Sequence, residues 1–358
     1  MSFPCKESAA AAPGLLVIIV NYRTAALVID CLESLFEDVT LPADGAVIVA
    51  DGASGDGSVE MLRSAIDAHG WQQRAHLLAL ETNLGFSHAN NCAYAHACFL
   101  LGRPRHVLFL NPDTVVRRNG LLPLLDFVEA HPRVGIVGAR LEDPDGTPQA
   151  CAFRFPSILG EFESEAKLGP VSRALGKWQV AASTGEEPVQ VDWVSGAAML
   201  ARSEVLDEVG LLDESYFLYY EEVDFCRRTA AAGWHCWHVP QSRIVHLVGC
   251  STGVTKHLAP ARRPRYWFAS RDRFFSKHHG RHYARWANAA WIAGHILFRL
   301  RLAVERKVFA GPPHLLADFL RHSLGVRSGK LETPLHEADV CGSSSRRRGH
   351  HQCFKRGR

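Results

Sequence analysis

Uninterrupted runs of apolar residues, many of them β-branched, are the feature that most constrains how this chain can fold. LLVIIV at residues 15–20 has no polar position, as expected for a strand buried on both faces of a sheet. Similar runs recur at residues 46–50, 76–80, 106–110 and 134–141, and segments with helical periodicity separate them. This alternation predicts an α/β fold in which helices cover a mostly parallel sheet.

The segments between the predicted strands are expected to be helices, at residues 25–37, 58–70, 87–101 and 121–131. Residues 151–190 break this rhythm with scattered prolines and glycines, and they predict a long loop or a partly ordered insertion. Regular structure is expected to resume with a strand in VDWVSGAAMLARS, residues 191–203.

The chain has 358 residues, 47% of them hydrophobic, which is enough for one large core. Its formal net charge is +3, but the basic surplus lies in the C-terminal third, which ends in SRRRGHHQCFKRGR. We expect a flexible N-terminus at residues 1–13, a main domain at 14–255, a helical extension at 256–330 and a basic, disordered tail at 331–358.

Ten cysteines are scattered without a C-x-x-C pair, which favours reduced thiols over a disulfide scaffold or a zinc site. The first fourteen residues hold a single lysine and no long apolar segment, so the sequence predicts no secretory signal. Both observations predict a cytoplasmic location.

WANAAWIAGHILF at residues 286–298 carries no Asp, Glu, Lys or Arg and is flanked by Arg285 and Arg299. It is shorter than the roughly 20 residues that a membrane-spanning helix needs. A helix lying in a membrane interface would suit Trp286 and Trp291, and anionic lipid would attract the arginines. A helix packed on the main domain fits the same pattern, so the sequence leaves both interpretations open.

Polar motifs follow several predicted strands, where ligands of parallel sheets gather. VADGASGDGS places Asp51 at a strand end, NLGFSHANN offers Asn83 and Gly85, and LFLNPDT ends in a turn with Asn111 and Asp113. Asp113 could hold Mg²⁺ or Mn²⁺, which need only one or two carboxylates when substrate phosphates complete the shell. Taken alone, each motif fits a capped turn equally well.

RIVHLVGCSTG places His246 in an apolar strand just before a glycine-rich turn. A single histidine in such a strand is more often a core residue than a ligand. The neighbouring WHCWH has no second cluster with zinc-ligand spacing, so it does not predict a zinc site.

These motifs, together with residues 192–234 and VPQSRIVHLVGCSTG, occur in the order typical of family 2 glycosyltransferases, and the chain most resembles the bacterial rhamnosyltransferase branch. The resemblance covers about residues 15–279. It implies a GT-A fold, a nucleotide-sugar donor, Mg²⁺ or Mn²⁺ as cofactor, and inversion at the sugar carbon.

The resemblance also implies residue roles. Asp113 and His246 would belong to the metal and diphosphate site. The residues expected to bind the donor nucleotide, with Asp51 at the base, are Asn21, Asp51, Asn83, Gly85, Asn111 and Arg271. The sugar and acceptor pocket would be lined by Trp193, Ser195 and Gly196. The chain departs from the family pattern at Gly52, where Asn is usual.

YFLYYEEVDFCRR holds three candidate catalytic carboxylates, on Glu221, Glu222 and Asp224. If a helix begins near residue 220, Asp224 and Arg228 stand at i and i+4 and pair, which lowers the pKa of Asp224 and makes it a poor base. Glu222 would point roughly 160° away from Asp224. The family's catalytic base, usually Asp, maps onto Glu222, and Glu221 is the alternative. The alternative to a catalytic role is that the three acids form a solvated first turn, which the helix dipole stabilises.

The sequence therefore predicts an inverting, metal-dependent glycosyltransferase with a lipid-linked or cell-surface glycan as acceptor and no nucleic-acid partner. Deoxythymidine diphosphate-rhamnose is the expected donor, and a uridine diphosphate sugar such as galactofuranose or N-acetylhexosamine is the alternative. A non-catalytic nucleotide- or glycan-binding module is the rival of another class. A nucleotidyltransferase is disfavoured because no G-x-G-T-R-like loop follows the first strand. The expected location is the cytoplasm, with peripheral contact at the cytoplasmic face of the inner membrane.

Overall fold

The apolar runs form the predicted sheet in the computed structural model, which describes residues 12–37, 40–182, 185–248 and 262–323. Four strands pair in parallel in the order β3-β2-β1-β4. Their bounds are β1 Leu15–Asn21, β2 Gly45–Asp51, β3 Ala75–Ala79 and β4 His106–Leu110. Each lies where the sequence predicts a strand, to within a residue or two.

The other half of the sheet is mixed. β10 (Ala198–Arg202) lies antiparallel between β4 and β6 (Val134–Glu142), and β6 pairs in parallel with β11 (His235–His246). β5 (Thr114–Val116) and β8 (Val189–Val191) pair antiparallel with β11. A separate pair joins β7 (Ala152–Phe153) to β9 (Trp193–Val194). The strand predicted at residues 191–203 is therefore divided between β9 and β10.

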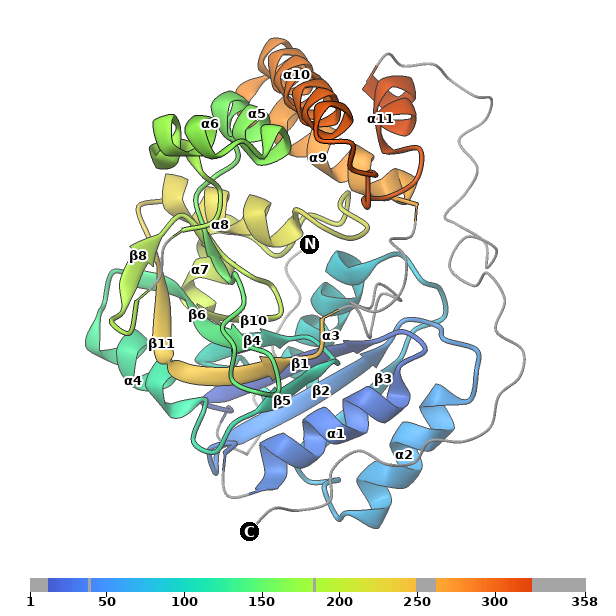
Figure 1. Cartoon of the computed structure of the whole chain (residues 1–358). Coiled ribbons are helices and arrows are strands. Elements are labelled where there is room, and N and C mark those ends of the chain that lie inside the picture. Colours follow the sequence, from blue (N-terminus) through green and yellow to red (C-terminus); the bar gives the residue numbers. More distant parts are fainter. Residues whose placement is uncertain (1–11, 38–39, 183–184, 249–261, 324–358) are drawn as a thin grey trace. The chain divides into compact units, whose positions relative to one another are not determined.

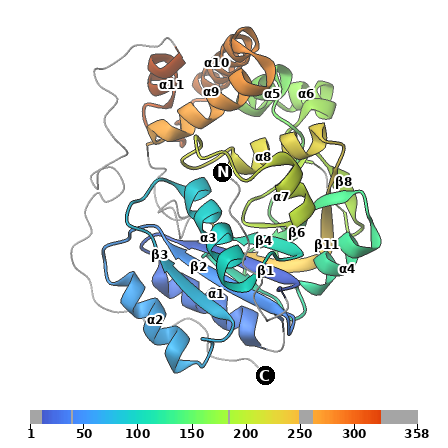
Figure 2. The same ribbon diagram turned by 180° about the vertical axis from the view of Figure 1, so that it is seen from behind.

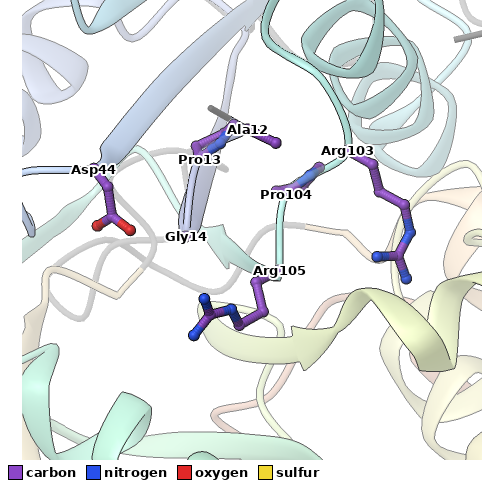
Figure 3. A pocket seen from close by; sticks show the side chains of 7 residues that line it. All are labelled: Ala12, Pro13, Gly14, Asp44, Arg103, Pro104 and Arg105. Carbon is purple, nitrogen blue, oxygen red and sulfur yellow. The ribbon is translucent and has the colours of Figure 1, made fainter. Parts of the chain in front are cut away.

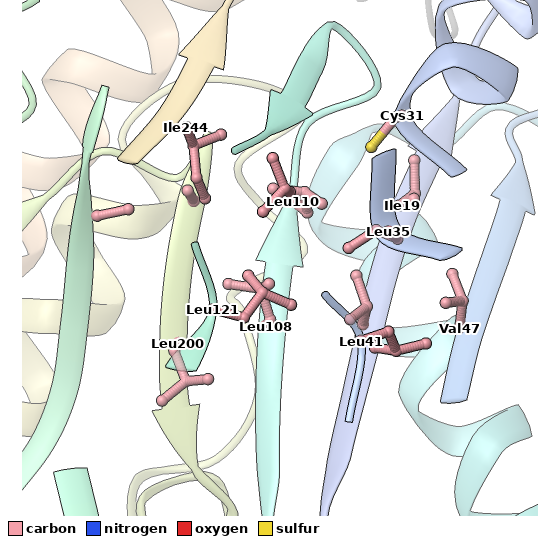
Figure 4. Packing of buried hydrophobic residues seen from close by; sticks show 14 of the residues in the cluster. Ile19, Cys31, Leu35, Leu41, Val47, Leu108, Leu110, Leu121, Leu200 and Ile244 are labelled. Carbon is pink, nitrogen blue, oxygen red and sulfur yellow. The ribbon is translucent and has the colours of Figure 1, made fainter. Parts of the chain in front are cut away.

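Helices cover both faces of the sheet because successive strand residues point to opposite sides. Val17 and Ile19 belong to a hydrophobic core that also contains residues of α1 (Ala25–Phe36), α2 (Ser58–Ala68) and α4 (Leu122–Ala130). Leu16 and Ile18 belong to a second core that contains residues of α3 (Phe86–Leu101), α7 (Ser203–Val209) and α8 (Glu221–Ala231). Figures 1 and 2 show the two faces of the sheet. Figure 4 shows how Ile19 and its neighbours pack in the core on the α1 side.

The prediction of irregular structure at residues 151–190 is wrong for much of that segment. It contains α5 (Ile158–Ala166), α6 (Gly169–Ala174) and a 3₁₀ turn, Gly176–Trp178. The side chain of Ser157 caps α5 by accepting a hydrogen bond from the Gly160 amide. Pro156, Gly169, Pro170 and Gly176 stand just before or at the start of helical turns, and Gly160 lies in the first turn of α5, so none of them interrupts a helix.

The three C-terminal helices are α9 (Arg265–His279), α10 (Arg281–Val304) and α11 (Leu315–Ser323). They pack on each other, and α10 packs along α5 (Figure 1). The close approach of α10 to α5 uses Gly294, where a Cβ would lie 2.6 Å from the Phe162 carbonyl oxygen. Within the described residues, no helix is both long enough and apolar enough to cross a membrane. The predicted tail at 331–358 and most of the predicted flexible N-terminus lie outside the described residues.

Candidate active site

The predicted polar residues at the strand ends meet at one edge of the sheet. Asn21 and Asp51 are partners in the β1–β2 register, and β4 ends beside β1 just before the turn that carries Asn111 and Asp113. This is the C-terminal edge of the parallel strands, where ligands of such sheets bind. The candidate site is therefore built here.

A hollow at the opposite edge does not compete with this site. It lies at the N-terminal ends of β1 and β4 and is lined by Ala12, Pro13, Gly14, Asp44, Arg103, Pro104 and Arg105 (Figure 3). Its two arginines are already paired, Arg103 with Asp207 and Arg105 with Glu129. The cations in this hollow thus have carboxylate partners within the chain.

Asp51 is buried and held by a compact hydrogen-bond network. Its Oδ2 accepts from Asn21 Nδ2 at 2.6 Å and from Ser54 Oγ at 2.6 Å, and its Oδ1 accepts from the Ser54 amide at 2.9 Å. The Asn21 Oδ1 accepts in turn from the Thr24 amide at the start of α1. The carboxylate is fixed in place, so the loops after β1 and β2 act as one unit.

The NLGFSHANN segment has a structural function that the sequence did not indicate. Gly85 has φ of +101°, and a Cβ there would lie 2.4 Å from the Phe217 carbonyl oxygen, so the close approach is to Phe217 and serves packing. Asn83 Oδ1 accepts from the Gly85 amide. Ser87 Oγ donates to the Tyr216 carbonyl, and His88 pairs with Glu214 at 2.9 Å. The segment therefore fastens residues 214–217, which lead into α8.

Asp113 and His246 come together across the β5–β11 pair. His246 Nε2 lies 3.5 Å from Asp113 Oδ1, and both side chains are largely buried. His246 Nδ1 contacts Gln149 Oε1 at 3.2 Å. Two motifs more than a hundred residues apart in the sequence thus form one carboxylate–imidazole pair.

This pair suits a divalent cation whose remaining positions are filled by phosphate. Carboxylate oxygen and imidazole nitrogen are both ligands of Mn²⁺, and carboxylate oxygen is a ligand of Mg²⁺. In the described part of the chain, no group of three or more His, Cys, Asp or Glu side chains has metal-binding geometry. The donor set thus fits a cation bound together with its substrate and does not form a closed structural site.

α8 begins where the sequence places it, after a strained turn. Tyr219 and Tyr220 have φ of 69° and 68°, a left-handed conformation that costs roughly 1–3 kcal/mol for a non-glycine residue. The turn brings the first residues of α8 against the loop between β9 and β10. A Cβ at Gly196 would lie 3.5 Å from the Cβ of Glu222. Glu222 therefore stands directly over Gly196.

Trp193 and Ser195 lie on the strand and loop just before Gly196, the residue that faces Glu222. The Trp193 ring stacks on Phe153 with centroids 4.1 Å apart, and its Nε1 donates to the Arg154 carbonyl at 2.9 Å. The Ser195 amide donates to the Cys151 carbonyl. The predicted pocket residues thus lie together, and neighbouring strands hold them firmly.

Burial distinguishes two of the three acids of α8 from ordinary surface carboxylates. It raises the pKa of Glu222 to about 7, and together with the charge of Glu222 it raises the pKa of Glu221 well above its usual range. The Oε2 atoms of both residues are buried and have no hydrogen-bond partner among the described residues. A carboxylate with a pKa near neutrality is suited to accept a proton.

Asp224 is in a different environment, as the sequence predicts. It pairs with Arg228 at 2.9 Å, Lys277 at 2.6 Å and His278 at 2.7 Å. Burial alone would raise the pKa of Asp224, but hydrogen bonds from these three residues outweigh it and lower the pKa to about 2. Asp224 therefore anchors α8 to α9, and its carboxylate is a poor proton acceptor.

Replacing Asp224 with Asn is expected to lower the free energy of unfolding by about 3 kcal/mol, because the cations around it lose their buried counter-charge. Urea unfolding at neutral pH measures this. The exposed pair Arg103–Asp207 is the control, since Asp207→Asn should cost about 1 kcal/mol or less. Equal losses for the two variants would contradict the anchoring role.

Arg271 lies away from the predicted donor site. It is 2% exposed, and its guanidinium donates to Glu161 Oε2 and to Asn288 Oδ1 between α9, α5 and α10. It also covers the rings of Phe275 and Phe319. Because these groups surround the guanidinium, the structure assigns Arg271 to the packing of the C-terminal helices and not to contact with donor phosphates.

Several known proteins share sequence or fold with this chain. Residues 16–160 match the sequence profile described as Glycosyl transferase family 2. An N-acetylglucosaminyl-diphospho-decaprenol L-rhamnosyltransferase of Mycobacterium tuberculosis (strain CDC 1551 / Oshkosh) is 30% identical over 279 residues, which cover 73% of this chain and 86% of that protein. Rhamnosyltransferase WbbL of Escherichia coli (strain K12) is 28% identical over 164 residues, 45% of this chain and 60% of that protein.

Among solved structures, a mannosyltransferase, PcManGT from Pyrobaculum calidifontis in complex with GDP-Man and Mn²⁺, shares the fold with a TM-score of 0.53. The match covers 90% of this chain and 83% of that one at 17% sequence identity, so it supports the GT-A fold alone. The sequence relatives and the fold lead to the same assignment. The chain belongs to glycosyltransferase family 2 and is a GT-A enzyme similar to rhamnosyltransferases.

Proposed function

We propose that this glycosyltransferase is an inverting, metal-dependent enzyme that moves L-rhamnose from deoxythymidine diphosphate-rhamnose to a lipid-linked glycan acceptor. The observation that carries the proposal is the position of Glu222, a carboxylate with a pKa of about 7 directly over Gly196. The choice of sugar and acceptor rests on the 30%-identical relative, whose name specifies L-rhamnose and a diphospho-decaprenol acceptor.

In the proposed reaction, Glu222 accepts the proton of the acceptor hydroxyl. The hydroxyl oxygen forms a bond to the anomeric carbon while the bond from that carbon to the diphosphate oxygen breaks, and the electron pair leaves with the diphosphate. A single displacement of this kind inverts the anomeric carbon. The strained turn at Tyr219 and Tyr220 and the anchor at Asp224 hold Glu222 over Gly196.

Asp113 and His246 are the residues that would hold Mg²⁺ or Mn²⁺. Such an ion neutralises the negative charge that grows on the departing diphosphate. Asp51, with Asn21 and Ser54 around it, would face the nucleotide base from the ends of β1 and β2. Asn83 and Asn111 lie on the loops that follow the neighbouring strands and complete the proposed donor site.

The donor is tested by binding deoxythymidine and uridine diphosphates, and their sugars, with and without Mn²⁺. The proposal predicts that deoxythymidine diphosphate-rhamnose binds most tightly, and only when the metal is present. Tightest binding of a uridine diphosphate sugar would replace rhamnose with the alternative donor. Equal binding with and without Mn²⁺ would contradict the metal-dependent part of the proposal.

A lipid-linked acceptor requires the enzyme to reach a membrane surface. We propose that α10 makes this contact. Its outward side carries an apolar stripe, defined here as Trp286, Ile296, Leu300 and Val304, which are 45–84% exposed. On ideal helix geometry the four residues fall within about 80° of the helix circumference. Trp291, which the sequence also suggested for membrane contact, is 3% exposed and stacks on Phe319. The candidate surface therefore excludes Trp291 and extends beyond residues 286–298 to Leu300 and Val304.

The charge of α10 favours an anionic lipid surface as the partner. The helix contains four arginines, at positions 281, 285, 299 and 301, and no Asp or Glu. Apolar residues flanked by cations are typical of helices that lie in the plane of an anionic membrane interface. We therefore place the enzyme on the cytoplasmic face of the inner membrane.

Replacing both Leu300 and Val304 with Glu is expected to lower binding to phosphatidylglycerol-containing vesicles at least about tenfold, because it removes apolar contact and adds negative charge. Vesicle sedimentation measures the binding, with phosphatidylcholine vesicles as the uncharged comparison. Phe99→Glu, an equally exposed apolar position on α3, is the control and should bind like the wild type.

Equal vesicle binding by the double variant and the wild type would overturn the membrane proposal. A wild-type dimer that the double variant dissociates, without vesicle binding, would instead assign the stripe to a contact between two copies of the chain. Neither outcome depends on which donor the enzyme uses.

A further inference from the structure

Gln149 stands beside the Asp113–His246 pair and was not among the predicted site residues. Gln149 follows the turn at residues 143–147, and its backbone N–H donates to the Leu141 carbonyl oxygen at 2.8 Å. Its side-chain Nε2 lies 2.7 Å from Asp143 Oδ1 and 2.8 Å from the carbonyl oxygen of His246. A carboxylate and a carbonyl only accept hydrogen bonds, so the NH₂ group of Gln149 must face them.

This orientation determines which nitrogen of His246 carries hydrogen. With its NH₂ group engaged, Gln149 presents Oε1 to His246 Nδ1 at 3.2 Å. An amide oxygen only accepts, so Nδ1 must be the protonated nitrogen. In the neutral imidazole, Nε2 then has the free lone pair, and it faces Asp113 Oδ1 at 3.5 Å. Two electron-rich atoms therefore point toward each other.

We infer that Gln149 is a positioning residue that sets the tautomer and ring orientation of His246, so that Nε2 and Asp113 together bind a divalent cation. One amide group holds both the backbone carbonyl and the ring of His246, which prevents ring rotation. Hydrogen bonds of this kind to a metal-binding histidine strengthen metal binding. The inference rests on the proposed metal site and adds a residue that no ligand motif contains.

Gln149→Met keeps the size of the side chain and removes all of its hydrogen bonds. It is expected to weaken Mn²⁺ binding about 10- to 100-fold, measured by electron paramagnetic resonance of free Mn²⁺ in the presence of deoxythymidine diphosphate. Gln72→Met is a matched control, because the Gln72 amide also donates to a carbonyl and a carboxylate, both of Asp67, at a distant position. The control should bind Mn²⁺ like the wild type.

A double-mutant cycle separates positioning from a general loss of structure. In a His246→Ala background, Gln149→Met should cause no further loss of Mn²⁺ affinity, because the ring that it orients is absent. Equal further loss in that background, or wild-type affinity in Gln149→Met alone, would overturn the inference and leave the proposed metal site intact. Absence of Mn²⁺ binding in the wild type would instead remove the metal site itself, and the inference with it.

Discussion

Glu222→Gln is expected to lower kcat by about 10²- to 10⁴-fold, the contribution typical of a general base. The amide has the same size and keeps its place over Gly196, but it cannot accept the proton of the acceptor hydroxyl. Binding of the donor should stay within about twofold, because the proposed donor residues lie on other loops. Steady-state kinetics and donor titration together measure both effects.

Two further variants test whether the loss of kcat is specific to Glu222. Glu60→Gln makes the same chemical change in the first turn of α2, at an exposed position, and should leave kcat unchanged. Glu221→Gln changes the neighbouring buried acid and should reduce kcat much less than Glu222→Gln. A large loss in Glu221→Gln with normal turnover in Glu222→Gln would transfer the role of base to Glu221.

Asp113→Asn is expected to abolish the effect of Mn²⁺ on donor binding, a loss of at least about 100-fold in affinity for the diphosphate with metal present. The change removes the negative charge that would hold the cation, and it leaves His246 facing a neutral amide. Titration of deoxythymidine diphosphate with and without Mn²⁺ measures the loss.

The matched control for this variant is Asp126→Asn on the exposed side of α4, which should retain metal-dependent binding. Asp113→Asn should also lose turnover, since the leaving diphosphate would no longer be neutralised. Normal Mn²⁺-dependent binding by Asp113→Asn would show that the metal lies elsewhere.

Strands β1 to β4 could be predicted because their signal is local. A strand buried on both faces must be apolar at nearly every position, and LLVIIV and HVLFL meet that requirement without reference to the rest of the chain. The antiparallel insertion of β10 between β4 and β6 could not be predicted, because strand order depends on pairing between distant segments.

The ion pair of Asp224 was predictable because its signal is local as well. Helix geometry places Asp224 and Arg228 one turn apart, and they form the expected ion pair. The further partners Lys277 and His278 come from α9, more than fifty residues away, and no local pattern indicates them. The contact of Glu222 with Gly196 is likewise a product of tertiary packing.

Arg271 shows where a motif can mislead. Its place in the sequence resembles that of a donor-binding arginine, but its partner Glu161 lies on α5, in a segment whose prolines and glycines predicted a loop. Once α5 is recognised as a helix packed on α10, a buried ion pair explains Arg271 fully. The buried partner of Arg271 could therefore not be predicted from the sequence.

The central claim is that Glu222 acts as the base, and the pH dependence of kcat/KM tests it most directly. A base must be ionised, and burial raises the pKa of Glu222 to about 7. For the wild type, kcat/KM should therefore rise about tenfold per pH unit below that value and level off above it, and Glu222→Gln should lose this rise. A wild-type profile that is flat from about pH 5.5 to 8.5, or a rise that persists in Glu222→Gln, would contradict the claim.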